Sequence, residues 1–413
     1  MRFEHPDLPG RDLRLAYCLN LHGADDFAGV LRGMDAITLP LRDRLAGDGL
    51  FGVGMYFPAA IATHLDSAQG AADRAQLRAY LQRERLDPFT FNAFPFGGFH
   101  ADGLKQSVFA PTWFEDERLQ YTLAVGRLAA ELNGPHAGHV SISTHPGRFG
   151  PWEGAQFAEA CARLEQVVMA FAEIESQGGA RLRLALEAEP RAVAGDMASL
   201  GELLNSIREA LEPRVGAERI AAHLGACLDT CHASVEFESA AQAVSSVSVL
   251  PLGKVQVSSA IRLRDPGSQP LARRELFALD EPRYLHQTTG MRGTEFLRAT
   301  DLPEVEAACA DPNSAWLTCD EWRTHFHVPI DLQRLEGNGL ETTRDHALET
   351  LQELLAHPEL WGAPQLHVEI ETYTWDILPK SAGGGADLVQ GLEREYRPVL
   401  QVLEKAGWRQ VTG

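Results

Sequence analysis

The chain has 413 residues, of which 45% are hydrophobic and 23% are charged, so it has enough apolar material for a large core. Its 37 basic and 57 acidic side chains give a net charge of −20, which argues against nucleic acid as a partner. The sequence shows no secretory signal pattern, no apolar run long enough to span a membrane and no CxxC cysteine pair, so we expect a cytoplasmic protein without stable membrane insertion.

Short apolar segments alternate with helical patterns along most of the chain. Strands are predicted at 13–18, 51–57, 89–94, 139–144, 182–189, 224–229, 254–259 and 365–372. Helices are predicted at 24–46, 58–86, 115–133, 153–178, 194–212, 236–245, 341–357 and 386–406. Strands that are apolar on both faces and alternate with helices are typical of a parallel sheet. Eight such units without a Gly-rich dinucleotide fingerprint favour the α/β class and a closed (β/α)8 barrel.

The alternating pattern breaks between about residues 260 and 340. This stretch is rich in Pro, Arg and Gly and contains one further predicted strand at 322–330. We interpret residues 1–413 as a single barrel domain with a long insertion between units seven and eight. An insertion of this length in a compact enzyme is more often functional than not.

Ionisable side chains recur at the carboxyl ends of the predicted strands, which meet at one mouth of such a barrel. They are Glu187 and Glu189 at strand five, Asp229 and His232 at strand six, Gln256 in strand seven, His325 and His327 in the insertion, and Glu369 and Glu371 at strand eight. Buried carboxylates need a compensating cation. Carboxylates with a histidine and an amide oxygen form a mixed donor set that suits Mn, Mg, Co or Zn.

The stretch "LDTCHAS" (228–234) allows three interpretations: Asp229 and His232 can bind a metal, form a catalytic pair, or cap the next helix. Their place beside the other strand-end carboxylates makes the cap the weakest of the three. The choice between neighbouring glutamates at strands five and eight stays open, since Glu369 or Glu371 can instead form a salt bridge inside the barrel.

Further side chains around the mouth are candidates for substrate binding. They are Asn92, His100, His145, Glu189, His232, His286, His325 and Trp375. Aromatic residues nearby can wall an apolar or sugar-like ligand, although core packing explains them as well. The glycines of "SAGGG" (381–385) can hold an anion beside a helix start or simply form a flexible loop.

Several of these segments resemble a known superfamily. "LDTCHAS", "LALEAEP" and "VEIETYTW" resemble the metal-binding strand ends of the xylose-isomerase-like barrels, which include ketose epimerases and endonuclease IV. More narrowly, segments such as "NAFPFGGFH", "STHPGRFGPW" and "THFHVPI" are similar, in order along nearly the whole chain, to the EboE family of metabolite traffic proteins. This resemblance implies a (β/α)8 barrel and a role in processing or export of a secondary metabolite.

The resemblance also implies a divalent-metal site built from Glu187, Asp229 and Glu371, with His232 as a second ligand or a substrate contact. At strand seven, where the superfamily places a histidine, this chain has Gln256, whose carbonyl oxygen is a weaker ligand. His325 or His327 from the insertion can supply the missing nitrogen. The predicted metal ligands are therefore Glu187, Asp229, Gln256, His327 and Glu371, and the predicted catalytic residues are Glu187, Glu371 and His232.

Three functions fit this set of residues. The first is a metal-dependent isomerase or epimerase of a small metabolite, in which the metal polarises a carbonyl and a glutamate moves a proton. The second is a barrel that binds or hands over a metabolite without turnover. The third is metal-dependent hydrolysis of a phosphoester. Expected partners are a small-molecule metabolite and other proteins of the same gene cluster.

Overall fold

The computed structural model describes residues 1–98, 103–133, 138–335, 337, 339–378 and 387–411. Eight parallel strands pair side by side, and the last pairs back onto the first, so the sheet closes into a barrel. They are β2 (Asp12–Cys18), β3 (Phe51–Tyr56), β4 (Leu86–Asn92), β5 (Val140–Thr144), β6 (Leu182–Glu187), β7 (Leu224–Asp229), β8 (Leu252–Val257) and β14 (Gln365–Ile370). The predicted (β/α)8 barrel is confirmed, because each strand is buried along nearly its whole length and helices lie between successive barrel strands, with a second sheet inserted after β8.

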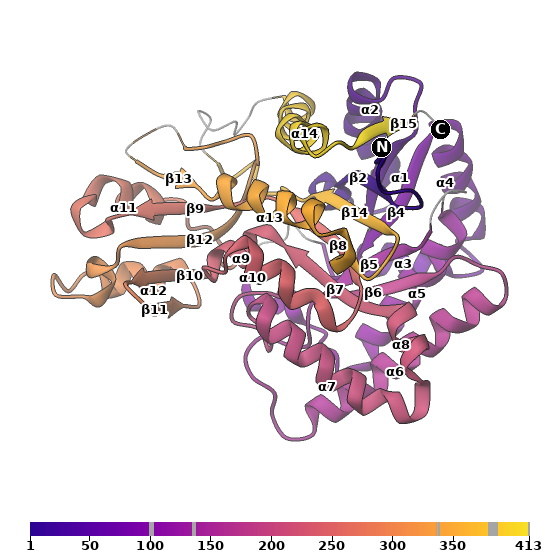
Figure 1. Ribbon diagram of the computed structural model, residues 1–413, viewed down its shortest axis with the longest axis horizontal. Helices are drawn as coiled ribbons and strands as arrows, with labels where there is room; N and C mark the ends of the chain where they lie inside the picture. Colours follow the sequence, from indigo (N-terminus) through magenta and orange to yellow (C-terminus); the bar gives the residue numbers. More distant parts are fainter. Residues whose placement is uncertain (99–102, 134–137, 336, 338, 379–386, 412–413) are drawn as a thin grey trace.

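Helices form the outer layer of the barrel (Figure 1). They are α1 (Phe27–Gly33), η2 (Met34–Thr38), α2 (Leu39–Leu45), α3 (Ala59–Asp66), α4 (Ala71–Arg83), α5 (Asp116–Leu132), α6 (Gln156–Ser176), α7 (Met197–Val215), α8 (Ala217–His223), α9 (Thr230–Val235), α10 (Ala240–Ser245), α13 (Arg344–Ala356) and α14 (Leu388–Lys405). The single helix predicted at 58–86 is wrong, because the chain turns between α3 and α4. A Cβ at Gly70 would come within 2.0 Å of the His64 carbonyl oxygen, so the turn needs glycine there.

A second, antiparallel sheet follows β8 directly and extends away from the barrel (Figure 1). Its strands are β9 (Ser259–Arg264), β10 (Thr288–Arg292), β11 (Glu295–Ala299), β12 (Glu321–Val328) and β13 (Glu341–Thr342), with helices α11 (Pro270–Phe277) and α12 (Leu302–Ala308). Only Ser258 separates β8 from β9, so the strand predicted at 254–259 is the junction of two strands. Trp322 and Phe326 lie in an apolar cluster that is separate from the barrel core and also includes Leu378 from the segment after β14.

The barrel interior contains buried ion pairs among its apolar side chains. Arg14 Nη1 lies 2.5 Å from Asp87 Oδ2. Lys254 forms an ion pair with Glu369, and the side chains of Lys254 and Glu369 are fully buried. A Cβ at Gly54 on β3 would collide with Glu369 Oε1, which places that carboxylate inside the barrel. Of the two glutamates predicted at strand eight, Glu369 on β14 is therefore the one that forms a salt bridge within the barrel, as one of the predicted alternatives had it.

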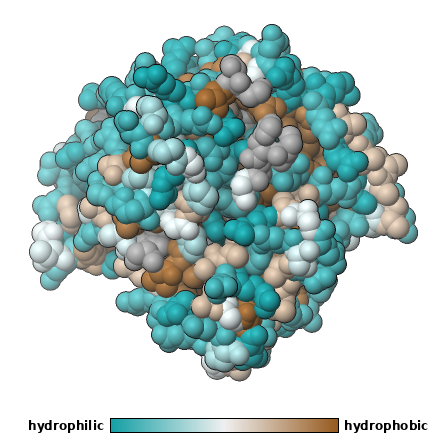
Figure 2. Space-filling model, turned by 45° about the vertical axis from the view of Figure 1, so that its right-hand side comes forward, coloured by the Kyte–Doolittle hydropathy of each residue, from teal (hydrophilic) through white to brown (hydrophobic). Residues whose placement is uncertain are grey.

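The two ends of the described chain meet beside β2, where β1 (Arg2–Glu4) pairs with both β2 and β15 (Arg409–Val411). The face seen in Figure 2 is mostly hydrophilic, with apolar side chains in small separate groups. Among the helices that the structure describes, none combines the length and the apolar character needed to cross a membrane.

Candidate metal centre

A cavity lies between the barrel mouth and the second sheet. Water-sized molecules have about 60 Å³ of space inside it. Its polar lining comes from Asn92, Glu187, Glu189, His232, Gln287, His325, His327 and Glu371, and its apolar walls include Phe94, Val108, Phe109, Tyr284, Leu285 and Tyr373. The cavity therefore brings together side chains from the barrel strands and from the segment that follows β8.

Three carboxylates converge at the barrel end of this cavity. Glu187 ends β6, Asp229 ends β7 and Glu371 follows β14, and one oxygen of each lies within 4.8 Å of the others. All three are buried, and Glu187 Oε2 and Asp229 Oδ2 have no hydrogen-bond partner among the described residues. Unpartnered buried carboxylate oxygens that face one another fit a divalent cation, which would compensate their charge. We call these three residues the carboxylate cluster.

Amide groups hold Glu371 in place within the carboxylate cluster. Asn20 Nδ2 and Asn92 Nδ2 donate to Glu371 Oε1 at 2.8 and 3.0 Å, and Gln256 Nε2 donates to Oε2. Gln256 Oε1 accepts a hydrogen bond from Cys227 Sγ at 2.7 Å. The Gln256 amide therefore orients Glu371 in this structure, and its role as a metal ligand stays a prediction. Asn20 was missed in the sequence, because it lies beyond the end of β2, whereas Asn92 is the last residue of β4.

Burial raises the pKa of each carboxyl group in the carboxylate cluster. For Glu187 the charges of Glu371 and Asp229 add to the effect of burial, and for Glu371 the charge of Glu369 does so. The pKa of Asp229 is also raised by burial, against an opposing effect of His327. Carboxyl groups in such surroundings either bind a cation or exchange a proton near neutral pH.

Three histidines converge beside the carboxylate cluster. His232 Nε2 lies 3.1 Å from His325 Nε2 and 3.1 Å from His327 Nε2, and all three rings are buried. Burial lowers the pKa of His232 to about 3 and that of His327 to about 4, so these rings are neutral at pH 7. Glu189 Oε2 lies 3.2 Å from His232 Nε2. We call His232, His325 and His327 the histidine cluster.

Asp229 links the two clusters because it also caps the helix that carries His232. Its Oδ1 accepts a hydrogen bond from the His232 backbone N–H at 2.9 Å, at the start of α9. Judging the cap to be the weakest interpretation of Asp229 was therefore wrong. The cap uses only Oδ1, so Oδ2 remains available to a cation, and the two roles do not compete.

Three predicted substrate-binding residues lie outside the cavity lining. His145 packs against the rings of Phe94 and Phe109, with ring centroids 5.4 and 5.7 Å away. His286 stacks on Phe326 at 3.8 Å, behind the cavity wall. Trp375 lines a separate hollow near the start of α14. Asn92, Glu189, His232 and His325, by contrast, do line the cavity.

Two further predictions cannot be placed. His100 and the glycine stretch 381–385 lie outside the described residues. The ligand roles predicted for them therefore stay predictions.

No protein-family model matches this chain, and no curated protein matches its sequence. Solved structures that align with it include an IOLI protein with a binding zinc atom, at 10% identity, a TM-score of 0.43, and coverage of 95% of this chain and 99% of that one. A D-tagatose 3-epimerase-like protein aligns at 13% identity and a TM-score of 0.45, with the same coverage. D-allulose 3-epimerase from Methylomonas sp. in complex with D-allulose aligns at 11% identity and 0.46, over 95% and 98%.

Proposed function

We propose that this protein is a metal-dependent isomerase or epimerase of a small polyhydroxylated or carbonyl metabolite. The carboxylate cluster carries the proposal, because Glu187, Asp229 and Glu371 offer converging oxygens, two of which have no hydrogen-bond partner among the described residues. A divalent cation held there would supply Lewis-acid polarisation of a carbonyl oxygen and its neighbouring hydroxyl oxygen.

Glu187 and Glu371 are the groups that move protons in this proposal. They reach the cavity from β6 and from the end of β14, which are separated by β7 and β8 in the barrel. Burial and neighbouring carboxylates raise the pKa of each, so each is a stronger base than a solvated carboxylate. Asn20 and Asn92 fix Glu371, so one carboxyl is held rigidly while the other has a free oxygen.

The apolar walls set the environment in which the proton moves. Tyr284 and Tyr373 line the cavity and pack against each other, with ring centroids 5.0 Å apart. Apolar side chains around a polar floor exclude water, which strengthens electrostatic interactions with a bound substrate. The small space inside the cavity favours a small metabolite.

A second function is binding and handover of a metabolite without turnover. It is favoured by Gln256, which donates to Glu371 where the xylose-isomerase-like barrels have a histidine ligand, and by the aromatic walls. The resemblance to the EboE family supports a role in an ebo-type pathway that processes or exports a secondary metabolite. On this proposal the protein works in the cytoplasm, where it binds a small molecule and interacts with other proteins encoded in the same gene cluster. Nucleic acid is not a partner.

Proton exchange on ketoses separates the two functions. The protein is loaded with Mn²⁺ and incubated in D₂O with a panel of ketohexoses, and deuterium at the carbon next to the carbonyl is followed by NMR. An isomerase incorporates deuterium, needs the metal, and loses this activity in Glu187→Gln. Saturable ketose binding that persists without metal and without exchange supports the binding protein instead.

Metal content tests the site itself. Asp229→Asn and Glu187→Gln keep the shape of the side chains, and the asparagine keeps an oxygen that can cap α9. Both variants are expected to lose bound Mn²⁺. Unchanged Mn²⁺ stoichiometry in both would remove the carboxylate cluster as the metal site.

A further inference from the structure

The Nδ1 atoms of His232 and His325 face away from the histidine cluster, and both act as hydrogen-bond donors. His232 Nδ1 lies 2.8 Å from the carbonyl oxygen of Ala188, and His325 Nδ1 lies 2.8 Å from Gln287 Oε1. The Gln287 amide is oriented by its own Nε2, which donates to Glu189 Oε1 at 2.9 Å. Carbonyl oxygens only accept, so both Nδ1 atoms carry hydrogen and both Nε2 atoms are lone-pair acceptors.

His327 has the same arrangement. Its Nδ1 lies 3.2 Å from the carbonyl oxygen of Glu371 and 2.9 Å from Ser258 Oγ. Only an Nδ1 that carries hydrogen satisfies both contacts, because the carbonyl oxygen cannot donate. The neutral ring of His327 therefore also turns an Nε2 lone pair toward His232.

The lone pairs of His325 and His327 consequently both point at that of His232, without a proton between them. His232 Nε2 is 3.1 Å from each of the other two Nε2 atoms, and Glu189 Oε2 stands 3.2 Å from it. Acceptors at this separation repel one another unless a cation lies among them. Ligand atoms about 2.1 Å from one shared ion are about 3.0–3.4 Å apart in octahedral or tetrahedral geometry, and His232 Nε2 has such a separation from His325 Nε2 and from Glu189 Oε2. Ligand atoms of Glu189, His232 and His325 also lie within 4.8 Å of one another.

We propose that His232 and His325, together with the carboxylate of Glu189, hold a second divalent cation of the zinc class, and that His327 packs beside His232 next to this ion. This ion is separate from the one proposed at the carboxylate cluster, and the inference does not rest on the proposed reaction. A set of imidazole nitrogens prefers Zn²⁺ or Co²⁺, whereas a set of carboxylate oxygens suits Mn²⁺ or Mg²⁺. The carbonyl groups behind each ring are the kind of partner that fixes the tautomer of metal-binding histidines.

The backbone of β12 is distorted where the two histidines project. The register between β12 and β9 shifts between Thr324 and Val328, and His327 has φ +40°, in the left-handed region. Strain of this kind persists where the surrounding structure holds it and is concentrated at ligand sites. Here it accompanies the placement of both rings against His232.

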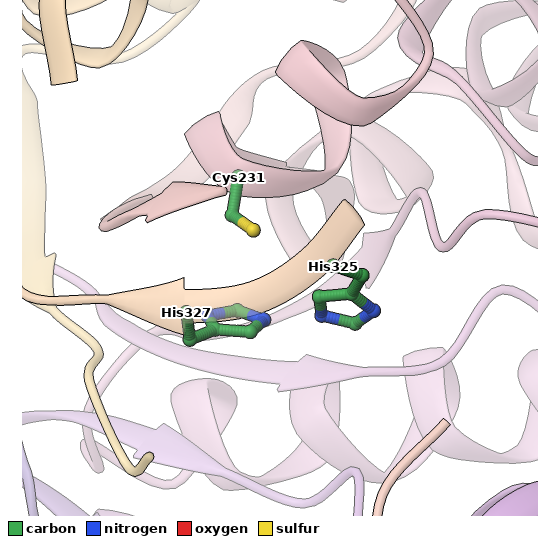
Figure 3. A group of neighbouring side chains, drawn as sticks. All are labelled: Cys231, His325 and His327. Carbon is green, nitrogen blue, oxygen red and sulfur yellow. The ribbon is translucent and has the colours of Figure 1, made fainter. Parts of the chain in front are cut away.

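Cys231 does not belong to this donor set, although its sulfur is near both rings of β12. In Figure 3 the ribbon of β12 passes between the sulfur and the rings of His325 and His327. Nitrogen and oxygen ligands therefore define the site.

Metal titration of the chelator-treated protein tests the second site. The wild type is titrated with Zn²⁺ alone and with Co²⁺ alone, by calorimetry and visible absorption. We expect a Zn²⁺ equivalent that disappears in His325→Asn and in Glu189→Gln, together with visible absorption from one bound Co²⁺. Glu187→Gln retains this equivalent and loses Mn²⁺, so failure of either site is seen separately.

The controls address folding and chance binding. His357→Asn removes a half-exposed histidine that does not line the cavity. This variant is expected to bind Zn²⁺ as the wild type does. His325→Asn and Glu189→Gln change two different segments of the chain, so the pair decides even if one variant has a lowered melting temperature. A wild type that binds no Zn²⁺, or His325→Asn and Glu189→Gln variants that both bind it unchanged, overturns the proposal.

Discussion

Gln287 Oε1 accepts a hydrogen bond from His325 Nδ1 at 2.8 Å, and this contact fixes which nitrogen of His325 faces the histidine cluster. The contact joins β12 to the segment before β10, so the tautomer of a proposed ligand depends on how the second sheet folds. It leads to the first of four predictions.

Gln287→Leu is expected to weaken Zn²⁺ binding by about 10- to 100-fold, because His325 loses the acceptor that orients its ring. Gln287→Glu keeps an acceptor at the same place and serves as the matched control, with a smaller loss. Competition against a zinc-binding dye measures both affinities. Equal affinity in Gln287→Leu and the wild type would show that this contact does not orient a ligand.

Gln256→Leu is expected to weaken Mn²⁺ binding by about 10- to 100-fold, because Glu371 loses a hydrogen bond to Oε2 that holds it in the carboxylate cluster. Zn²⁺ binding at the histidine cluster stays close to the wild-type value. Calorimetric titration with each ion separates the two effects. A Gln256→Leu protein with full Mn²⁺ affinity would contradict the orienting role of Gln256.

Lys254→Met is expected to lower the free energy of unfolding by about 3–5 kcal/mol, because it leaves the fully buried charge of Glu369 without its partner. The double variant Lys254→Met with Glu369→Leu removes both charges and should recover most of this loss. Urea unfolding at pH 7 measures the three proteins. Additive losses in the double variant would show that the two side chains are not coupled.

Glu395 predicts a pH-dependent stability. Burial raises its pKa from 4.5 to about 8, while Thr372 Oγ1 donates to its Oε2 at 2.7 Å. Because the folded state favours the protonated carboxyl, its contribution is fully present below pH 4.5 and is lost as the pH rises through 8. The loss at high pH is on the order of 5 kcal/mol.

Glu395→Gln therefore matches the wild type near pH 5 and is more stable than the wild type at pH 9. Unfolding in urea at several pH values gives the difference between the two proteins, in which titration of all other groups cancels. A difference that does not change with pH would contradict a raised pKa at Glu395.

The barrel could be predicted because its information is local. The apolar segments of β2 to β8 and β14 are buried on both faces, and all of them except β8 are followed by a helix, so their spacing along the chain predicts the class of sheet. The convergence of Glu187, Asp229 and Glu371 follows from the same rule, since the carboxyl ends of parallel barrel strands share one mouth. The cap at Asp229 was underrated because strand ends and helix starts coincide there.

What the sequence by itself determined is thus the closed barrel and the strand-end carboxylates, both of which depend on periodicity and strand polarity. Only the tertiary structure decided that His232 meets His325 and His327, which lie 93 and 95 residues further along the chain. Their meeting depends on the register shift between β12 and β9, which lies between Thr324 and Val328, and on the packing of β12 over the barrel mouth. Such long-range packing leaves no periodic mark in the sequence, and so the histidine cluster appears only in the folded chain.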